Sequence, residues 1–89
     1  MEKCGYNIVI DMEEVSVDDI KEVDKLAKCL GVESNSYEYG DYYCYDKKTS
    51  DEFLSKIISD KLAETIYLYV GKESDDYIWN LLATITINK

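Results

Sequence analysis

Residues 36–46, SYEYGDYYCYD, are the part of the chain in which chemically useful side chains are most concentrated. They hold five of the nine tyrosines together with three carboxylates and one thiol. Tyrosine presents a large rigid ring with a polar tip, so binding surfaces favour it, and the ring can receive a lysine or arginine as a cation–π partner. Carboxylates between tyrosines could also imitate alternating phosphates and stacked bases. The predicted partner-binding residues of this segment are Tyr37, Glu38, Tyr39, Asp41, Tyr43, Tyr45 and Asp46.

A second acidic segment covers residues 11–24, where seven acids stand against one lysine. A charge run is usually a solvated face, but two acidic clusters that converge in space would form a binding surface. The tyrosines likewise have a structural alternative, in which their rings cover a sheet and their hydroxyls stay in water. The acids added to the predicted partner surface are Asp11, Glu13, Glu14, Asp18 and Asp19.

Catalytic side chains are scarce. The chain has no histidine, so a serine or cysteine nucleophile would lack its ordinary base. Cys4, Cys29 and Cys44 are widely spaced, form no CxxC pair and have no activating context, which predicts reduced packing thiols. Carboxylate pairs carry little information in a chain with 19 acids. We therefore expect no enzymatic activity.

Bound ions and cofactors are not expected either. The chain has no glycine-rich loop that could hold phosphates. Asp11, Glu13 and Glu14 could contact a hard cation, but their spacing does not match a calcium loop. The sequence therefore predicts no metal site and no cofactor.

Net charge is the strongest compositional feature. Nineteen acids stand against ten bases, all of them lysine, for a net charge of −9. Direct binding to nucleic acid needs lysine or arginine at the phosphates, so we expect none. The same charge suits a basic partner, such as a nucleic-acid-binding protein or effector complex whose groove normally receives phosphates. Solubility alone is the alternative explanation.

Length and hydropathy favour a small globular protein. At 89 residues, two separate cores would each be too small, so residues 1–89 are expected to form a single domain. An apolar content of 46% argues against disorder. No apolar run approaches the roughly 20 residues that span a bilayer, and the N-terminal run is too short for a signal peptide. We expect a cytoplasmic protein.

The first half of the chain predicts a strand followed by a helix. Residues 6–11 are typical of a buried strand. Ser16 is a good N-cap, acids follow in the first turn, and Gly31 is suited to end the helix. The predicted core-facing stripe of this helix consists of Val17, Ile20, Val23, Leu26, Ala27 and Leu30.

The tyrosine-rich segment allows more than one interpretation. As one strand, it places Tyr37, Tyr39, Asp41, Tyr43 and Tyr45 on one face and Glu38, Gly40, Tyr42, Cys44 and Asp46 on the other. Neither face is cleanly apolar, which favours an edge strand or a hairpin presented outward. A turn at residues 40–41 would make a hairpin, whereas a bulge at residue 40 would reverse the second half.

The second half predicts a helix and two strands. The helix begins at Thr49 in a capping box with Glu52, has a core stripe of apolar residues between positions 53 and 62, and frays near residue 63 or 64. Residues 65–70 and 77–88 alternate as strands, with a polar connection between them. A short helix over residues 75–83, capped by Ser74, is the competing interpretation.

These elements predict an α+β fold with the order β-α-β-α-β-β, or β-α-ββ-α-ββ if the tyrosine-rich segment is a hairpin. The expected architecture is a two-layer sandwich in which two helices cover one face of a mainly antiparallel sheet of four to five strands. A ferredoxin-like variant with an extra strand fits this order.

In size, acidity and tyrosine content, the chain resembles the small inhibitors that phages and mobile elements encode against bacterial defence nucleases. These inhibitors include anti-CRISPR proteins and DNA-mimicking anti-restriction proteins. The resemblance is compositional and spread over the whole chain. It implies a non-enzymatic inhibitor that docks on a nuclease or effector complex and blocks its nucleic-acid-binding site. If a phage encodes the chain, the resemblance implies that it acts in the host bacterial cytoplasm.

Two other functions stay open. An immunity protein that neutralises a basic nuclease toxin would share the acidic surface. A small ligand-sensing regulatory domain would instead have a concave apolar pocket and would form a homodimer through an exposed sheet edge. The sequence identifies neither the partner nor the oligomeric state.

Overall fold

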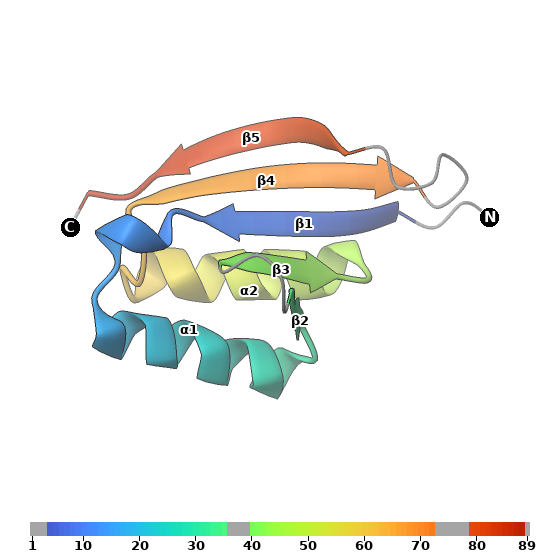
Figure 1. Cartoon of the computed structure of the whole chain (residues 1–89). Helices are drawn as coiled ribbons and strands as arrows, with labels where there is room; N and C mark the ends of the chain where they lie inside the picture. The colour runs from blue at the N-terminus through green and yellow to red at the C-terminus, as the bar shows by residue number, and fades with distance from the viewer. Residues whose placement is uncertain (1–3, 36–39, 73–78, 89) are drawn as a thin grey trace.

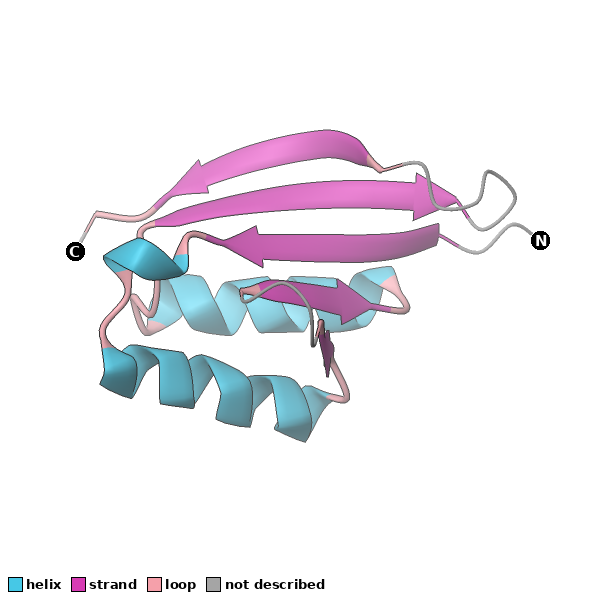
Figure 2. Cartoon of the chain, viewed as in Figure 1, coloured by secondary structure: helices cyan, strands magenta, loops and turns pink. Residues whose placement is uncertain are grey.

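The structure is a computed structural model that describes residues 4–35, 40–72 and 79–88. Within them, two helices cover one face of a five-stranded antiparallel sheet, which confirms the predicted two-layer α+β class (Figures 1 and 2). The elements in chain order are β1 (Cys4–Ile10), the 3₁₀ turn η1 (Met12–Glu14), α1 (Val17–Leu30), β2 (Glu33–Ser34), β3 (Asp41–Cys44), α2 (Lys47–Ser59), β4 (Thr65–Lys72) and β5 (Asn80–Thr86).

The strand order is β2-β3-β1-β4-β5, with every neighbouring pair antiparallel. The first four strands therefore have the arrangement β4-β1-β3-β2, with α1 and α2 in the two crossover connections. This is the topology of a ferredoxin-like fold, and β5 extends it beyond β4 as the predicted extra strand. β1 is the central strand, and β2 and β5 form the two edges.

Helix α1 has the predicted ends. Ser16 Oγ accepts the Asp19 N–H at 3.2 Å, and Gly31 closes the helix in the left-handed region with φ of 73°. Two expectations for its side chains were wrong. Val17, the first residue of the helix, is 67% exposed. Cys29 is exposed because it lies two residues from the buried Ala27, about 200° around the helix.

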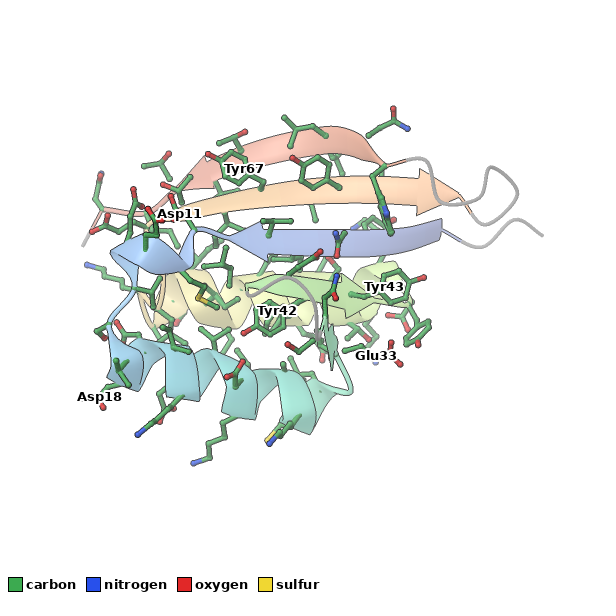
Figure 3. All side chains as sticks on the ribbon, viewed as in Figure 1. Asp11, Asp18, Glu33, Tyr42, Tyr43 and Tyr67 are labelled. Carbon is green, nitrogen blue, oxygen red and sulfur yellow. The ribbon has the colours of Figure 1, made fainter. Side chains whose placement is uncertain are left out.

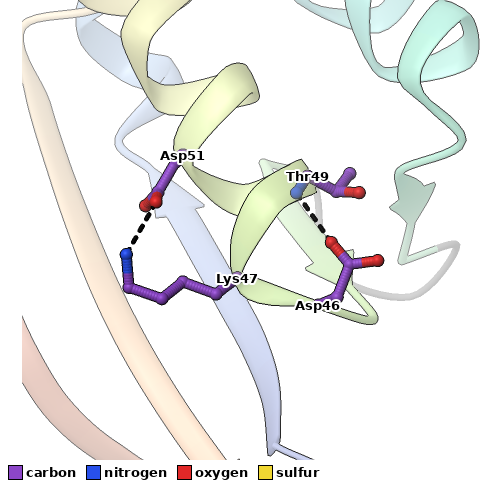
Figure 4. Close-up of polar contacts among 4 residues, drawn as sticks. All are labelled: Asp46, Lys47, Thr49 and Asp51. Atoms are coloured by element: carbon purple, nitrogen blue, oxygen red, sulfur yellow. Dashed lines mark hydrogen bonds and ion pairs between the residues drawn. The ribbon is translucent and has the colours of Figure 1, made fainter.

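Helix α2 has its N-cap three residues before the predicted N-cap Thr49. Asp46 has an extended backbone and its Oδ1 accepts the Thr49 N–H at 2.7 Å, so Asp46 is the N-cap (Figure 4). The predicted capping box at Thr49 was therefore wrong. The Thr49 N–H donates to the Asp46 side chain, so Thr49 lies inside the first turn of the helix and is not its N-cap. The helix also ends earlier than expected, at Ser59, since Lys61 has a positive φ of 51°.

The tyrosine-rich segment contributes an interior strand. β3 lies between β2 and β1, so the expectation of an edge strand was wrong. The predicted hairpin turn at residues 40–41 was wrong as well, because Asp41 already belongs to β3 and Tyr42 pairs with Ser34, which precedes the tyrosine-rich segment. Gly40 precedes β3 with φ of 90°, and its carbonyl accepts the Ile10 N–H at 2.8 Å. A Cβ at this position would lie 2.5 Å from the Ile10 carbonyl oxygen, so glycine is required there. Tyr37, Glu38 and Tyr39 lie outside the described residues.

The core lies between the sheet and the helices. Tyr42 and Cys44 face it from β3 and are almost fully buried, so the inner face of this strand is dry. The Tyr42 hydroxyl donates to Asp24 Oδ1 at 2.5 Å, which joins β3 to α1, and the Tyr42 ring meets Phe53 edge-to-face at 5.3 Å. The other core side chains with less than 3% exposure are Ile8, Ile10, Val23, Ala27, Ile57, Ala63 and Ile66.

The predicted unbroken alternation along residues 77–88 was wrong, because β5 contains a β-bulge. The pairing with β4 passes from Leu68–Ala83 to Tyr69–Leu81, so Leu82 is an extra residue. Such an insertion reverses the alternation of the side chains beyond it. The competing helix fails for residues 80–83, which are strand, and residues 75–78 lie outside the described part. Neither α1 nor α2 is long and apolar enough to cross a membrane.

Candidate functional site

One face of the sheet carries no described helix, and we call it the open face (Figure 3). Side chains alternate across a strand, so the residues opposite the core positions define it. Strand register arranges them in rows across the sheet. One row is Asp41, Val9, Tyr67 and Thr84, and the next is Glu33, Tyr43, Asn7, Tyr69 and Leu81.

The centre of the open face is hollow. The central strand presents the small side chains of Asn7 and Val9, whereas tyrosines follow the same face of the neighbouring strands. This difference in side-chain size leaves a concave region of about 450 Å³ along the middle of the sheet. Its lining consists of Asn7, Val9, Asn35, Asp41, Tyr69 and Trp79.

A pair of glycines supports two aromatic rings beside this hollow. Gly5 and Gly71 lie opposite each other in β1 and β4. A Cβ on Gly5 would lie 2.4 Å from the Tyr43 hydroxyl, and one on Gly71 would lie 2.9 Å from the Trp79 ring. The rings of Tyr43 and Trp79 meet edge-to-face at 5.9 Å, and Tyr45 continues the contact at 4.7 Å from Tyr43. We call Tyr43, Tyr45 and Trp79 the aromatic cluster.

Asp41 lies at the wall of the hollow and is only 8% exposed. Its Oδ2 accepts a hydrogen bond from Asn35 Nδ2 at 3.3 Å, and its backbone carbonyl accepts the Asn35 N–H at 2.8 Å. Its Oδ1 is buried and has no hydrogen-bond partner in the described part of the chain. A buried carboxylate with one unpaired oxygen is unusual, because the desolvation of that atom is not compensated.

Charge is distributed unequally between the two layers. Every lysine with a described side chain belongs to a helix or to the turn after α2: Lys21, Lys25, Lys28, Lys47, Lys48, Lys56 and Lys61. The described open face has carboxylates instead. Glu33 accepts the Tyr45 hydroxyl at 2.5 Å, and Glu14 accepts the Thr65 hydroxyl at 3.1 Å at the other end of the sheet. The described open face is thus aromatic and acidic.

Among the described residues, most of the acids of the two predicted clusters lie apart, and Glu38 is outside the described part of the chain. Asp11 and Asp18 lie at the end of the sheet where β1 finishes, and Tyr43 lies towards the opposite end (Figure 3). Register pairs Cys44 with Tyr6, four residues before β1 ends at Ile10, or about 13 Å at the rise of a strand. Glu13, Glu14 and Asp19 belong to the Asp11 end, and Asp46 follows Tyr45. Asp41 pairs with Val9, near the Asp11 end of the sheet, and it is buried.

Several predicted contact residues also have local structural roles. Asp11 accepts the Glu13 N–H at 3.2 Å and so caps η1. Asp46 caps α2, and this bond to the Thr49 N–H holds the pKa of Asp46 below its usual value. These carboxylates help to begin a helical turn, so replacing them tests folding together with binding.

The described side chains offer little for catalysis. Burial, and then the charge of Asp46, raises the pKa of the Cys44 thiol to about 12, so it does not form a thiolate at neutral pH. In the described part of the chain, no three cysteine and acidic side chains come together as a metal-binding group. A second hollow between α1 and α2, of about 170 Å³, is smaller and has lysines and acids in its lining.

The sequence did not single out five of the residues that line the hollow. The alternation of residues 65–70 already assigns Tyr69 to the face away from the core. Trp79 could not be assigned to a face of the sheet from the sequence, because the bulge at Leu82 reverses the alternation of the residues before it. The sequence around the other three lining residues has no pattern that marks a binding site, because the hollow depends on which strands flank β1. These residues are Asn7, Val9 and Asn35.

No protein family, no curated protein and no solved structure was found to match this chain. Its functional interpretation therefore depends on the geometry and chemistry of the open face.

Proposed function

We propose that this chain is a non-enzymatic protein-binding inhibitor of the anti-CRISPR or DNA-mimic type. It docks the open face of its sheet on a basic nuclease or effector complex and blocks the nucleic-acid-binding site there. The observation that carries the proposal is the separation of charge and aromatic side chains. The described open face has tyrosines, a tryptophan and carboxylates, whereas the described lysines belong to the helical side of the molecule.

Physical chemistry favours this face for a basic partner. Tyrosine and tryptophan are enriched in protein interfaces because they bury a large area and lose little conformational entropy. Carboxylates around them complement a positive groove and raise the rate of encounter. A partner that normally binds phosphates supplies such a groove. The free thiols of Cys29 and Cys44 agree with a reducing cytoplasm as the place of action.

The test compares two double variants that add the same charge to different faces. Thr84→Lys/Thr86→Lys adds two lysines to exposed positions of the open face, on β5. Ser55→Lys/Ser59→Lys adds two lysines to exposed positions on α2 and is the matched control. Asp41 and Asp46 are unsuitable for charge reversal, because one is buried and the other caps a helix.

Binding is measured against a panel of purified CRISPR effector nucleases and restriction endonucleases, each with and without its DNA substrate. We expect at least one enzyme to bind the chain and to lose DNA cleavage at stoichiometric ratios. The open-face variant should bind at least tenfold more weakly, and the α2 variant within twofold of the wild type. Equal effects of the two variants would contradict docking through the open face, and DNA cleavage unaffected in every complex would contradict inhibition.

A further inference from the structure

The outer side of β5 has backbone groups that face no further strand in the described part of the chain. β5 lies at the end of the strand order, and Figure 1 shows it as the strand farthest from α1 and α2. The Ile87 N–H donates to the Glu64 carbonyl at 2.8 Å, so Ile87 directs its backbone groups towards β4. Because this direction alternates along a strand, the N–H and C=O groups of Thr84 and Thr86 point away from the sheet.

The usual protection of an edge strand is weak at β5. Proteins discourage pairing at an exposed edge by charged side chains, proline, short length or a bulge. β2, the other edge, has only two residues, and one of them is Glu33. β5 has seven residues, and residues 79–88 contain neither a charged side chain nor proline. Its bulge at Leu82 leaves the pairing from Ala83 onwards regular. β5 is therefore the edge that can accept another strand.

The lack of charge selects what that strand belongs to. A basic partner is attracted to carboxylates, and this edge offers none. Two copies of this chain each carry a net charge of −9, so they approach with least repulsion where neither has a charged side chain. The neighbouring residues 65–71 of β4 are uncharged as well. Acids farther away than the Debye length of about 8 Å at physiological salt oppose the approach only weakly.

We propose that β5 pairs with β5 of a second copy of this chain, antiparallel, around a two-fold axis beside Ile85. Ile85 then lies opposite Ile85 of the second copy, and Ala83 lies opposite Ile87. Thr84 lies opposite Thr86, and each such pair exchanges both N–H···O bonds, because these residues point outward. Threonine pairs across neighbouring strands add to the stability of a sheet.

This register keeps like side chains on the same side of the joined sheet. Within one copy, Ile85 pairs with the buried Ile66 on the face that the helices cover, and Thr84 pairs with Tyr67 on the open face. Apolar side chains therefore meet apolar ones, whereas a shift by one residue would oppose the two faces. The contact uses the same surface on both copies, so it closes as a dimer. It leaves both open faces uncovered and does not depend on the proposed function.

Sedimentation of the full chain over a range of concentrations tests the dimer. We expect the mass to rise from the monomer value of 10.3 kDa towards twice that value, with a Kd in the micromolar range. Raising the ionic strength from about 0.01 M to about 0.15 M shortens the Debye length from about 30 Å to about 8 Å and should strengthen the dimer. Docking on a basic partner would weaken under the same change. A monomer mass at every salt and protein concentration up to millimolar would overturn the proposal.

Three double variants at exposed positions test the register. Thr84→Lys/Thr86→Lys and Thr84→Glu/Thr86→Glu place like charges opposite each other, although they change the net charge in opposite directions. Thr84→Lys/Thr86→Glu places opposite charges together at the same positions. Both like-charge variants should dimerise at least tenfold more weakly than the wild type, and the mixed variant within twofold of it or more tightly. Circular dichroism and the thermal midpoint check the fold. Equal dimerisation of all three variants would overturn the proposal.

Nuclease binding by the same variants separates this inference from the proposed function. Thr84→Glu/Thr86→Glu loses the dimer but keeps the open face acidic, so it should bind a nuclease nearly as well as the wild type. If the chain is a monomer and only Thr84→Lys/Thr86→Lys loses nuclease binding, the dimer is wrong and the inhibitor proposal stands. If the wild type dimerises and binds no nuclease, the dimer stands and the inhibitor proposal fails.

Discussion

The contact between Gly71 and Trp79 gives the sharpest test of the open face. A Cβ added to Gly71 would lie 2.9 Å from Cε3 and 3.0 Å from Cζ3 of the indole. Optimal carbon–carbon separations are about 3.5–4.0 Å, so the ring cannot keep its place over an alanine. We therefore expect Gly71→Ala to displace Trp79 from the sheet.

Two opposing contributions determine how much Gly71→Ala changes the free energy of unfolding. Overpacking by one methyl group costs about 1–3 kcal/mol. Alanine in a strand recovers roughly 0.5–1 kcal/mol relative to glycine, because the unfolded chain has less freedom to lose. Gly71→Ala should therefore lower the free energy of unfolding by about 0.5–2 kcal/mol in the wild type. In a Trp79→Ala background the clash is gone, and the same change should raise the free energy of unfolding by roughly 0.5–1 kcal/mol.

The assay is a double-mutant cycle of four proteins, measured by urea unfolding with circular dichroism. The expected coupling between the two positions is about 1–3 kcal/mol, which exceeds the usual error of such cycles. Trp79 is the single tryptophan, so a red shift of its emission in the folded Gly71→Ala protein would report exposure of the ring. An equal cost of Gly71→Ala in both backgrounds, with unchanged emission, would refute the contact.

The remaining predictions concern three other side chains. The Cys44 thiol has a pKa of about 12 in the folded chain against 9.0 for the free group, so it stabilises the fold only while the unfolded thiol is protonated. Between about pH 8 and pH 10.5, the wild type should lose about 2 kcal/mol more stability than Cys44→Ala, measured by urea unfolding at each pH. Tyr42→Phe removes the hydroxyl that donates to Asp24, and should lower the free energy of unfolding by about 1.5 kcal/mol. Asp46→Ala removes the acceptor of the Thr49 N–H. Because that bond lowers the pKa of Asp46, the variant's thermal midpoint should lie below that of the wild type at neutral pH and converge on it as the pH falls below 3.8.

Each of these predictions has a matched control. Cys29→Ala removes an exposed thiol and should leave the alkaline pH slope unchanged, so an equal change of slope would argue against burial as the cause. Tyr42→Phe should have little effect in an Asp24→Ala background, and a full effect there would show that the hydroxyl acts elsewhere. Asp46→Asn keeps a side-chain acceptor and should retain most of the helix stability that Asp46→Ala loses.

Local signals predicted parts of the fold well. Ser16 and Gly31 determine where α1 begins and ends, because a side-chain cap and a left-handed residue act within one turn of the helix. The alternation of residues 65–70 predicted β4 equally well. The start of α2 could not be predicted in the same way, since Asp46 and Thr49 are both good N-cap residues. The extended backbone at the end of β3 decided in favour of Asp46.

The candidate site was harder to predict than the elements. The tyrosine-rich segment contributes Asp41 to the lining of the hollow and Tyr43 and Tyr45 to the rings beside it. Its residues also divide between two roles, since Tyr42 and Cys44 enter the core. Sequence alternation gave both faces of β3, but it could not say which face the helices would cover, because both contain polar and apolar side chains.

By itself, the sequence determined the α+β class, most of α1, the alternation of β4 and an acidic, tyrosine-rich character. These properties depend on composition and on interactions between residues a few positions apart. The tertiary structure alone decided that Gly5 meets Gly71 beneath two aromatic rings, that the bulge in β5 turns Trp79 to the open face, and that Asp41 is buried beside a hollow. The physical reason is that strand order and register follow from the packing of one shared core, which joins residues far apart in the chain.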